Sequence, residues 1–92
     1  MNVLITGGSR GIGAACVRAF CKKGDRVAFF YRTASSETVE ALERETGAKG
    51  FLVDVRDADA VQSAVEQVTA YFDGKLHVLV ITLRALRPRL RG

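Results

Sequence analysis

A glycine-rich turn between a short apolar strand and a helix is the feature that most limits how this chain can fold. Residues 2–6 form an apolar, β-branched run that leads directly into Gly7 and Gly8. From Ile12 onward the apolar residues recur at helical spacing until Gly24, which ends the pattern. A buried strand, a glycine turn and a helix together predict the first half of a βαβ unit.

Three further apolar segments predict strands. Residues 26–31, 50–55 and 76–81 are short and rich in β-branched or aromatic residues. Helical patterns of about ten to fifteen residues separate them, which is typical of βαβ units and a parallel sheet. The sequence therefore predicts an α/β fold, a partial Rossmann (doubly wound) fold with about four parallel strands and three helices. We expect residues 1–81 to form one domain.

Hydrophobic periodicity also predicts which helix faces are buried. Ser35 or Ser36 is expected to cap the second helix, which runs to about Thr46 and is ended by Gly47. Asp57 is expected to cap the third helix, which is ended by Asp73-Gly74. In the first helix the apolar residues that recur at helical spacing are Ile12, Ala15, Cys16, Ala19 and Phe20. The positions expected to face the sheet are Val39 and Leu42 in the second helix and Val61, Ala64, Val65, Val68 and Phe72 in the third.

The positive charge is concentrated at one end of the chain. A formal charge of +4 and a pI near 9.5 would suggest nucleic acid or an acidic membrane surface as a partner. Residues 1–81 hold ten basic and ten acidic residues, whereas residues 82–92 hold four arginines and no acid. We therefore expect no nucleic-acid or membrane partner. Nucleic-acid binding by the basic tail stays as an alternative, which would require a steep dependence on salt.

Hydropathy and cysteine placement indicate the cellular compartment. No apolar run approaches the ~20 residues that span a bilayer, and no basic segment precedes the first strand. Cys16 and Cys21 are separated by about 7.5 Å of helical rise and lie on different faces of one predicted helix, so they cannot pair. We expect a cytoplasmic protein whose thiols stay reduced.

Residues 6–13 read T-G-G-S-R-G-I-G and suit a pyrophosphate-binding turn. Gly7 permits a tight turn after the strand, Gly11 lets the backbone approach a pyrophosphate, and Gly13 removes the Cβ between helix and strand. The free N–H groups at the helix start add donors and partial positive charge. A purely structural turn is the alternative, and the strand–turn–helix context favours binding.

The spacing of this turn is T-G-x-x-x-G-x-G, because Ser9 stands where G-x-G-x-x-G would place a glycine. That spacing resembles the short-chain dehydrogenase/reductase family, and the resemblance extends over residues 1–81. Asp54-Val55 resembles the family's adenine-contacting pair. Residues 74–80 resemble its G-x-L-D-x-L-V fourth strand, with His77 where Asp is usual. Within the family, the segment most resembles the 3-oxoacyl-acyl-carrier-protein reductase-like members.

The resemblance implies a dinucleotide cofactor, so we expect residues 1–81 to be an NAD(P)-binding Rossmann segment. Arg32 follows the second strand, where an NAD site would place an acid to accept from the ribose 2′-OH. Together with Arg10 it would pair with a 2′-phosphate, so we favour NADP(H) over NAD(H). Solvated charges are the alternative for both arginines, and a strand-end cap is the alternative for Asp54. The residues expected to contact the cofactor are Gly7, Ser9, Arg10, Gly11, Ile12, Gly13, Arg32, Asp54 and Val55.

The family's chemistry, as the resemblance implies, uses a Tyr-x-x-x-Lys pair together with a Ser. Tyr71 and Lys75 have that spacing, but Gly74 ends the helix between them and both precede the fourth strand, so we interpret the match as coincidence. We interpret Ser63 and His77 as structural.

The sequence therefore assigns no residue to catalysis and no metal ligand. A full-length form would be an oxidoreductase acting on a carbonyl or alcohol, and full-length relatives are expected to be homo-oligomeric. We expect the chain as it stands to be inactive. The alternative function is a non-catalytic nucleotide-binding module or partner subunit. An unprotected edge on the fourth strand would also predict poor solubility.

The resemblance stops after Val80. Codons can be chosen for residues 81–91 such that adding one base before them shifts the reading frame. The shifted frame then encodes N-N-A-A-G-I-A-A-P-A-Q, and the family's fourth strand is normally followed by N-N-A-G. We therefore interpret residues 82–92 as a basic tail, unstructured or produced by a frameshift. The hypothesis fails if no single-base change after the Val80 codon opens a long reading frame.

Overall fold

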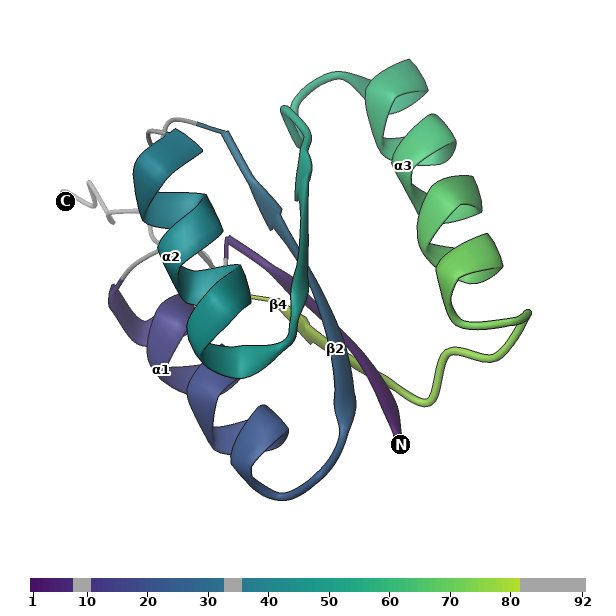
Figure 1. The fold of residues 1–92 in the computed structure, drawn as a ribbon. Helices are drawn as coiled ribbons and strands as arrows, with labels where there is room; N and C mark the ends of the chain where they lie inside the picture. Colours follow the sequence, from purple (N-terminus) through teal and green to yellow (C-terminus); the bar gives the residue numbers. More distant parts are fainter. Residues whose placement is uncertain (8–10, 33–35, 82–92) are drawn as a thin grey trace, which may run out of the picture.

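Strands and helices alternate along residues 1–7, 11–32 and 36–81, the part of the chain that the computed structural model describes. Four parallel strands form one sheet in the order β3-β2-β1-β4 (Figure 1). This arrangement confirms the predicted α/β fold with four parallel strands and three helices. The elements are β1 (Asn2–Thr6), α1 (Gly11–Lys22), β2 (Arg26–Tyr31), α2 (Ser36–Thr46), β3 (Lys49–Leu52), α3 (Ala58–Tyr71) and β4 (Val78–Ile81).

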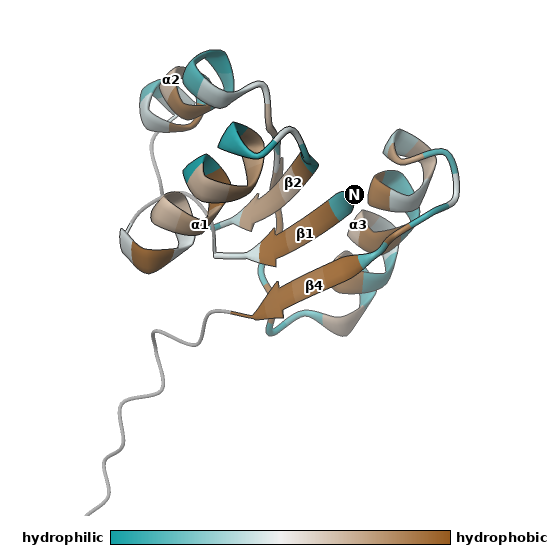
Figure 2. Ribbon diagram, turned by 90° about the horizontal axis from the view of Figure 1, so that it is seen from below, coloured by the Kyte–Doolittle hydropathy of each residue, from teal (hydrophilic) through white to brown (hydrophobic). Residues whose placement is uncertain are grey.

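The sheet lies between two helical layers. Helices α1 and α2 cover one face and α3 covers the other (Figures 1 and 2). In β2, Val27 and Phe29 belong to the core beneath α1 and α2, while Ala28 and Phe30 belong to the core beneath α3. Four consecutive buried apolar residues are typical of a central parallel strand that is covered on both faces.

Two strands are shorter than their hydrophobic runs predict. The third ends at Leu52 rather than at residue 55, because the last backbone hydrogen bond to β2 is donated by Val53 N to Tyr31 O over 2.9 Å. The fourth begins at Val78 rather than at residue 76. The imidazole of His77 accepts the hydrogen bond from Asn2 N, in place of a backbone carbonyl of β4. The predicted placement of Asp54 and Val55 within the third strand is therefore wrong, since both follow it.

The buried face of α1 is formed mainly by small residues. Its fully buried residues are Gly13, Ala14 and Val17, while Cys16 and Phe20 are partly buried against the core. Three of the apolar residues that recur at helical spacing in α1 are exposed, and they are Ile12, Ala15 and Ala19. On α3, Val65 was expected to face the sheet but is 40% exposed.

The predicted cap of α3 is confirmed. The Oδ1 atom of Asp57 caps α3 by accepting from the backbone N–H groups of Asp59 and Ala60 at 3.1 and 3.2 Å. The two cysteines, Cys16 and Cys21, are free and partly buried. No helix in the ranges described above is long and apolar enough to cross a membrane.

Candidate functional site

The turn between β1 and α1 adopts a backbone that favours glycine at both of its described ends. Gly7 has φ 71° and Gly11 has φ 62°, values in the left-handed region that side-chain-bearing residues seldom adopt. A Cβ on Gly11 would meet nothing within 4 Å, so backbone conformation rather than crowding favours glycine there. Ser9 and Arg10, both expected to contact a cofactor, lie outside the described residues.

The amino end of α1 follows this turn and carries no compensating negative charge. The first turn of α1 contains no acidic residue, so the partial positive charge of its free N–H groups is not neutralised from within the helix. Gly13 is buried against the sheet, whereas the side chain of Ile12 is 77% exposed. The end of β1 therefore leads to a helix start that suits an anion, with an apolar side chain beside it.

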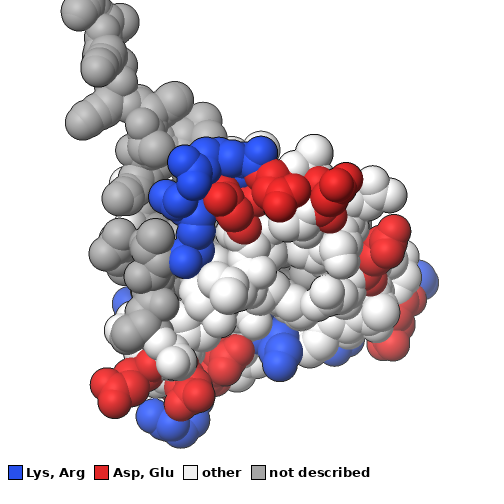
Figure 3. Space-filling view, turned by 90° about the horizontal axis from the view of Figure 1, so that it is seen from above, with Lys and Arg blue, Asp and Glu red and all other residues white. Residues whose placement is uncertain are grey.

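Charged residues follow the neighbouring strands β2 and β3. Tyr31 pairs with Leu52 at the ends of these strands, which places Arg32 and Asp54 at the same edge of the sheet. The charge of Arg32 contributes to lowering the pKa of Asp54. Figure 3 looks onto the molecule from the end toward which β2 and β3 run, and shows basic side chains directly beside acidic ones.

Asp54 is held by a residue that the sequence analysis did not identify, Arg56. Asp54 Oδ1 accepts from Arg56 N at 3.0 Å and from Arg56 Nε at 3.1 Å, and Oδ2 accepts from Arg56 Nη2 at 3.1 Å. These bonds, with smaller contributions from the charges of Arg56 and Arg32, lower the pKa of Asp54 to about 2. The only signal in the sequence was an acid followed two residues later by a base, just after a strand.

Exposed apolar side chains accompany these charges. Ile12 follows the glycine turn, Leu52 ends β3 and is 69% exposed, and Val55 follows Asp54 and is 58% exposed. Large apolar side chains left in water cost free energy unless something covers them. The carboxyl edge of the sheet therefore combines a positive helix start and an arginine with apolar surface, which suits a ligand that has both anionic and ring-shaped parts.

The residues with family-like catalytic spacing do not form a catalytic group. Helix α3 ends at Tyr71 and the chain reverses at Gly74, which has φ 86°, before Lys75. Tyr71 packs against the α3 core while Lys75 is exposed, in agreement with the structural interpretation of this pair. Ser63 is exposed on α3. Within the described ranges, no group of three or more His, Cys, Asp or Glu side chains could hold a metal ion.

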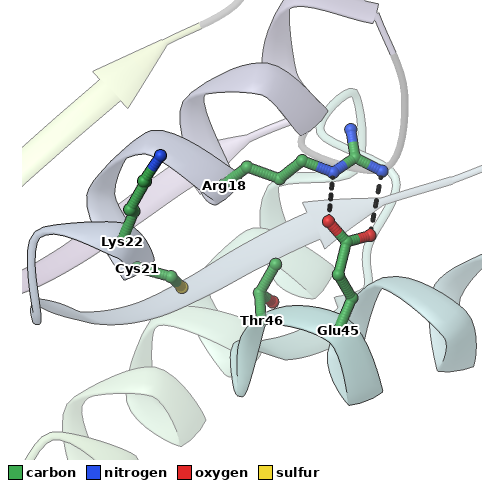
Figure 4. Close-up of a pocket in the computed structure, with 5 residues that line it drawn as sticks. All are labelled: Arg18, Cys21, Lys22, Glu45 and Thr46. Atoms are coloured by element: carbon green, nitrogen blue, oxygen red, sulfur yellow. Dashed lines mark hydrogen bonds and ion pairs between the residues drawn. The ribbon is translucent and has the colours of Figure 1, made fainter.

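A separate hollow of about 430 Å³ lies between α1 and α2 (Figure 4). Glu45 accepts from Arg18 Nε at 2.8 Å and from Arg18 Nη2 at 3.2 Å across its rim. Burial raises the pKa of the Cys21 thiol, so this cysteine is a poor nucleophile at neutral pH. The lining residues come from the carboxyl-terminal turns of both helices, at the end opposite the glycine turn, so the hollow is not part of the candidate site.

The chain has a parallel sheet of this strand order, a glycine turn that leads into α1, and charged residues after β2 and β3. These features are typical of the dinucleotide-binding α/β folds. The model of the family described as short chain dehydrogenase matches residues 1–82. The chain therefore belongs to the short-chain dehydrogenase/reductase family.

Curated relatives and solved structures agree with this assignment. The chain is 44% identical over 80 residues to the cyclic-di-GMP-binding biofilm dispersal mediator protein of Escherichia coli, and covers 31% of that protein with 87% of its own length. It is 39% identical over 83 residues to the L-rhamnose 1-dehydrogenase (NADP(+)) of Thermoplasma acidophilum, covering 32% of that protein with 86% of its own length.

Among solved structures, the short-chain dehydrogenase/reductase of Serratia marcescens matches with a TM-score of 0.81 and 37% identity, over 88% of this chain and 34% of that one. The crystal structure of E. coli BdcA in complex with NADPH matches with a TM-score of 0.74 and 38% identity, over 96% of this chain and 37% of that one. The chain thus spans about a third of the length of the relatives that it matches. The part that this chain shares with these relatives is the N-terminal cofactor-binding segment.

Proposed function

We propose that residues 1–81 bind NADP(H), as the cofactor-binding segment of an oxidoreductase that acts on a carbonyl or alcohol substrate. The observation that carries this proposal is the backbone of the glycine turn. Gly7 and Gly11 both have positive φ, and the turn ends at a helix start with no acid in its first turn. A turn of this kind brings backbone N–H groups to a pyrophosphate without a side chain in the way.

The pyrophosphate and the adenosine half of the cofactor have residues of fitting chemistry at the carboxyl edge of the sheet. The start of α1, from Gly11 to Gly13, would hold the pyrophosphate. Asp54 and Val55 would meet the adenine, with the carboxylate accepting from the amino group and the exposed valine covering the ring. When bound, NADPH would supply a hydride to a carbonyl, or NADP+ would accept one from an alcohol, and the residues of this chain would bind and orient the adenosine half.

Arg32 supports the preference for NADP(H) over NAD(H). It is exposed directly after β2, where its guanidinium can form charge-assisted bonds to a 2′-phosphate. An acid at this place would instead accept from the 2′-OH of NAD(H). The complex of a relative with NADPH and the NADP(+) in the name of another agree with this choice. Arg10 would be the second phosphate ligand.

We expect the 92-residue chain to bind the cofactor without catalysing hydride transfer. Tyr71 ends α3 and Lys75 lies beyond the turn at Gly74, so the two side chains do not share a helical face, and Ser63 is exposed on α3. The substrate and oligomeric state would be properties of the whole enzyme. An alternative role, as a non-catalytic subunit that binds a nucleotide, is supported by the exposed apolar residues of β4, Leu79 and Ile81.

Fluorescence titrations of the chain with NADPH and NADH test the proposal. We expect saturable binding of both, with NADPH bound at least about tenfold more tightly, as one lost charge-assisted contact would give. Arg32→Ala should remove most of that preference, whereas the control variant Arg44→Ala, which changes an exposed arginine on α2, should retain it. Cyclic di-GMP is titrated in parallel because one relative is named for binding it. Saturable binding of cyclic di-GMP alone would reject the NADP(H) proposal.

A further inference from the structure

The loop between β3 and α3 holds one carboxylate in a fixed orientation. Asp54 accepts from both the backbone N–H and the guanidinium of Arg56, through Oδ1, and from the guanidinium again through Oδ2. A planar guanidinium that bonds both oxygens fixes the plane of the carboxylate as well as its position. Asp57 N also donates to Asp54 O at 2.9 Å, so the backbone of this loop is turned back on itself.

The three bonds from Arg56 leave one acceptor position of the Asp54 carboxylate open to a ligand. A carboxylate offers about four acceptor positions, and the three bonds from Arg56 use most of them. The remaining position is on Oδ2, which bonds only Nη2 of Arg56 among the described residues. The side chain of Asp54 is 37% exposed, so a ligand can reach it without displacing Arg56.

The charge state of Asp54 decides which ligand groups it can bind. An aspartate is ionised near neutral pH at its ordinary pKa of 3.8, and the pKa of Asp54 is lowered further to about 2, so its side chain can only accept hydrogen bonds. A purine with an amino group at C6, such as adenine, offers a donor there. A purine with a carbonyl at C6, such as hypoxanthine, offers an acceptor that an ionised carboxylate repels.

We propose that Arg56 is a positioning residue that fixes the Asp54 carboxylate as an acceptor, and so makes the site prefer a 6-amino purine over a 6-oxo purine. This inference rests on the proposed function, since it concerns the base of the bound dinucleotide. Arg56 acts through Asp54 rather than on the base. The selectivity comes from the Asp54–Arg56 pair, whereas affinity for the phosphates comes from the glycine turn and Arg32.

The test compares NADPH with its hypoxanthine analogue, nicotinamide hypoxanthine dinucleotide phosphate, in fluorescence titrations of the full chain. The unaltered chain should bind NADPH at least about tenfold more tightly than the analogue, the factor expected for one hydrogen bond to a charged group. Arg56→Ala should reduce this ratio to below about threefold, because the carboxylate then rotates freely. Arg56→Lys should restore little of it, since an ammonium group lacks the planar fork. Arg44→Ala should leave the ratio unchanged.

A second readout follows the Asp54 carboxyl group directly. In ¹³C NMR titrations, the pKa of Asp54 should lie at about 2 in the unaltered chain and move toward its ordinary value in Arg56→Ala. A selectivity ratio unchanged in Arg56→Ala, with NADPH still bound, would overturn the inference about Arg56 alone. Failure of the unaltered chain to bind NADPH at all would overturn the proposed function as well.

Discussion

His77 and Asn2 join the beginnings of β4 and β1 through two hydrogen bonds of 2.9 Å. His77 Nδ1 accepts from Asn2 N, and His77 N donates to Asn2 O. The acceptor at this position belongs to a side chain where a parallel strand would normally supply a carbonyl. The aspartate that the family resemblance leads one to expect here would offer an oxygen at the same place.

Two substitutions of His77 should show whether the hydrogen-bond acceptor alone, rather than the imidazole ring, stabilises the fold at this position. His77→Asp should change the free energy of unfolding little, because a carboxylate oxygen can accept from Asn2 N. His77→Leu should destabilise by about 0.5–1 kcal/mol, the usual net value of one hydrogen bond. Urea unfolding followed by circular dichroism measures both, with Ser63→Ala on the exposed face of α3 as the control. Equal stability of His77→Leu and the unaltered chain would show that the bond contributes nothing.

Gly50 in β3 is required by close packing. A Cβ at this position would lie 2.8 Å from Cζ of Phe29 and 3.0 Å from Cγ1 of Val39, both in the buried core. Gly50→Ala should cost about 1–3 kcal/mol of unfolding free energy, the usual penalty of overpacking. The double variant Gly50→Ala with Phe29→Leu should lose less than the sum of the two single changes, because the smaller side chain makes room. Strict additivity in urea unfolding would contradict this packing.

Acid should weaken the fold partly through Asp54. Its pKa lies at about 2 in the folded chain, below the ordinary value of 3.8, so its contribution to stability is complete above about pH 5 and is lost as the pH falls toward 2. The difference in unfolding free energy between the unaltered chain and Asp54→Asn should shrink over that interval. Urea unfolding at a series of pH values measures it. A difference that stays constant from pH 6 to pH 2 would show that the Arg56 pairing does not form in solution.

The exposed face of β4 should cause self-association. Leu79 is 52% exposed and Ile81 is 59% exposed, and among the described strands β4 pairs only with β1. Size-exclusion chromatography at increasing concentration should show growing aggregates, and Leu79→Lys should reduce them, while Ser63→Lys, which adds the same charge on α3, should not. A single stable oligomer would instead favour the non-catalytic subunit that buries this edge against another chain.

The sequence predicted the fold because its strongest signals are local. The apolar run of β2 is buried on both faces, and the glycines after each helix mark where the helices end. The start of β4 was predicted wrongly because the side chain of His77 replaces a backbone partner there, and the end of β3 because its hydrogen bonds to β2 stop at Val53. A hydrophobicity pattern cannot show that the imidazole of His77 replaces a backbone carbonyl as hydrogen-bond acceptor. It also cannot show that the loop after Leu52 brings Arg56 into contact with Asp54.

The candidate site was harder to predict than the fold. The glycine turn is recognisable because backbone geometry restricts residue type, and Gly7 and Gly11 do have positive φ. The periodicity of α1 did not show which of its apolar residues face the sheet, because small residues on several sides of the helix leave its orientation to tertiary packing. Arg56 carried no periodic signal at all, since its role depends on a loop conformation rather than on a helix or strand.

Amide chemical-shift mapping tests the cofactor site most directly. Two-dimensional ¹H–¹⁵N spectra of the labelled chain, recorded during an NADPH titration, should show saturable changes concentrated at Gly7, Gly11 to Gly13, Arg32, Asp54 and Val55. The changes at Arg32 should be much smaller with NADH, which lacks the 2′-phosphate. The absence of saturable changes, or changes confined to the hollow between Arg18 and Glu45, would contradict the assignment of the glycine turn and the strand ends as a dinucleotide-binding site.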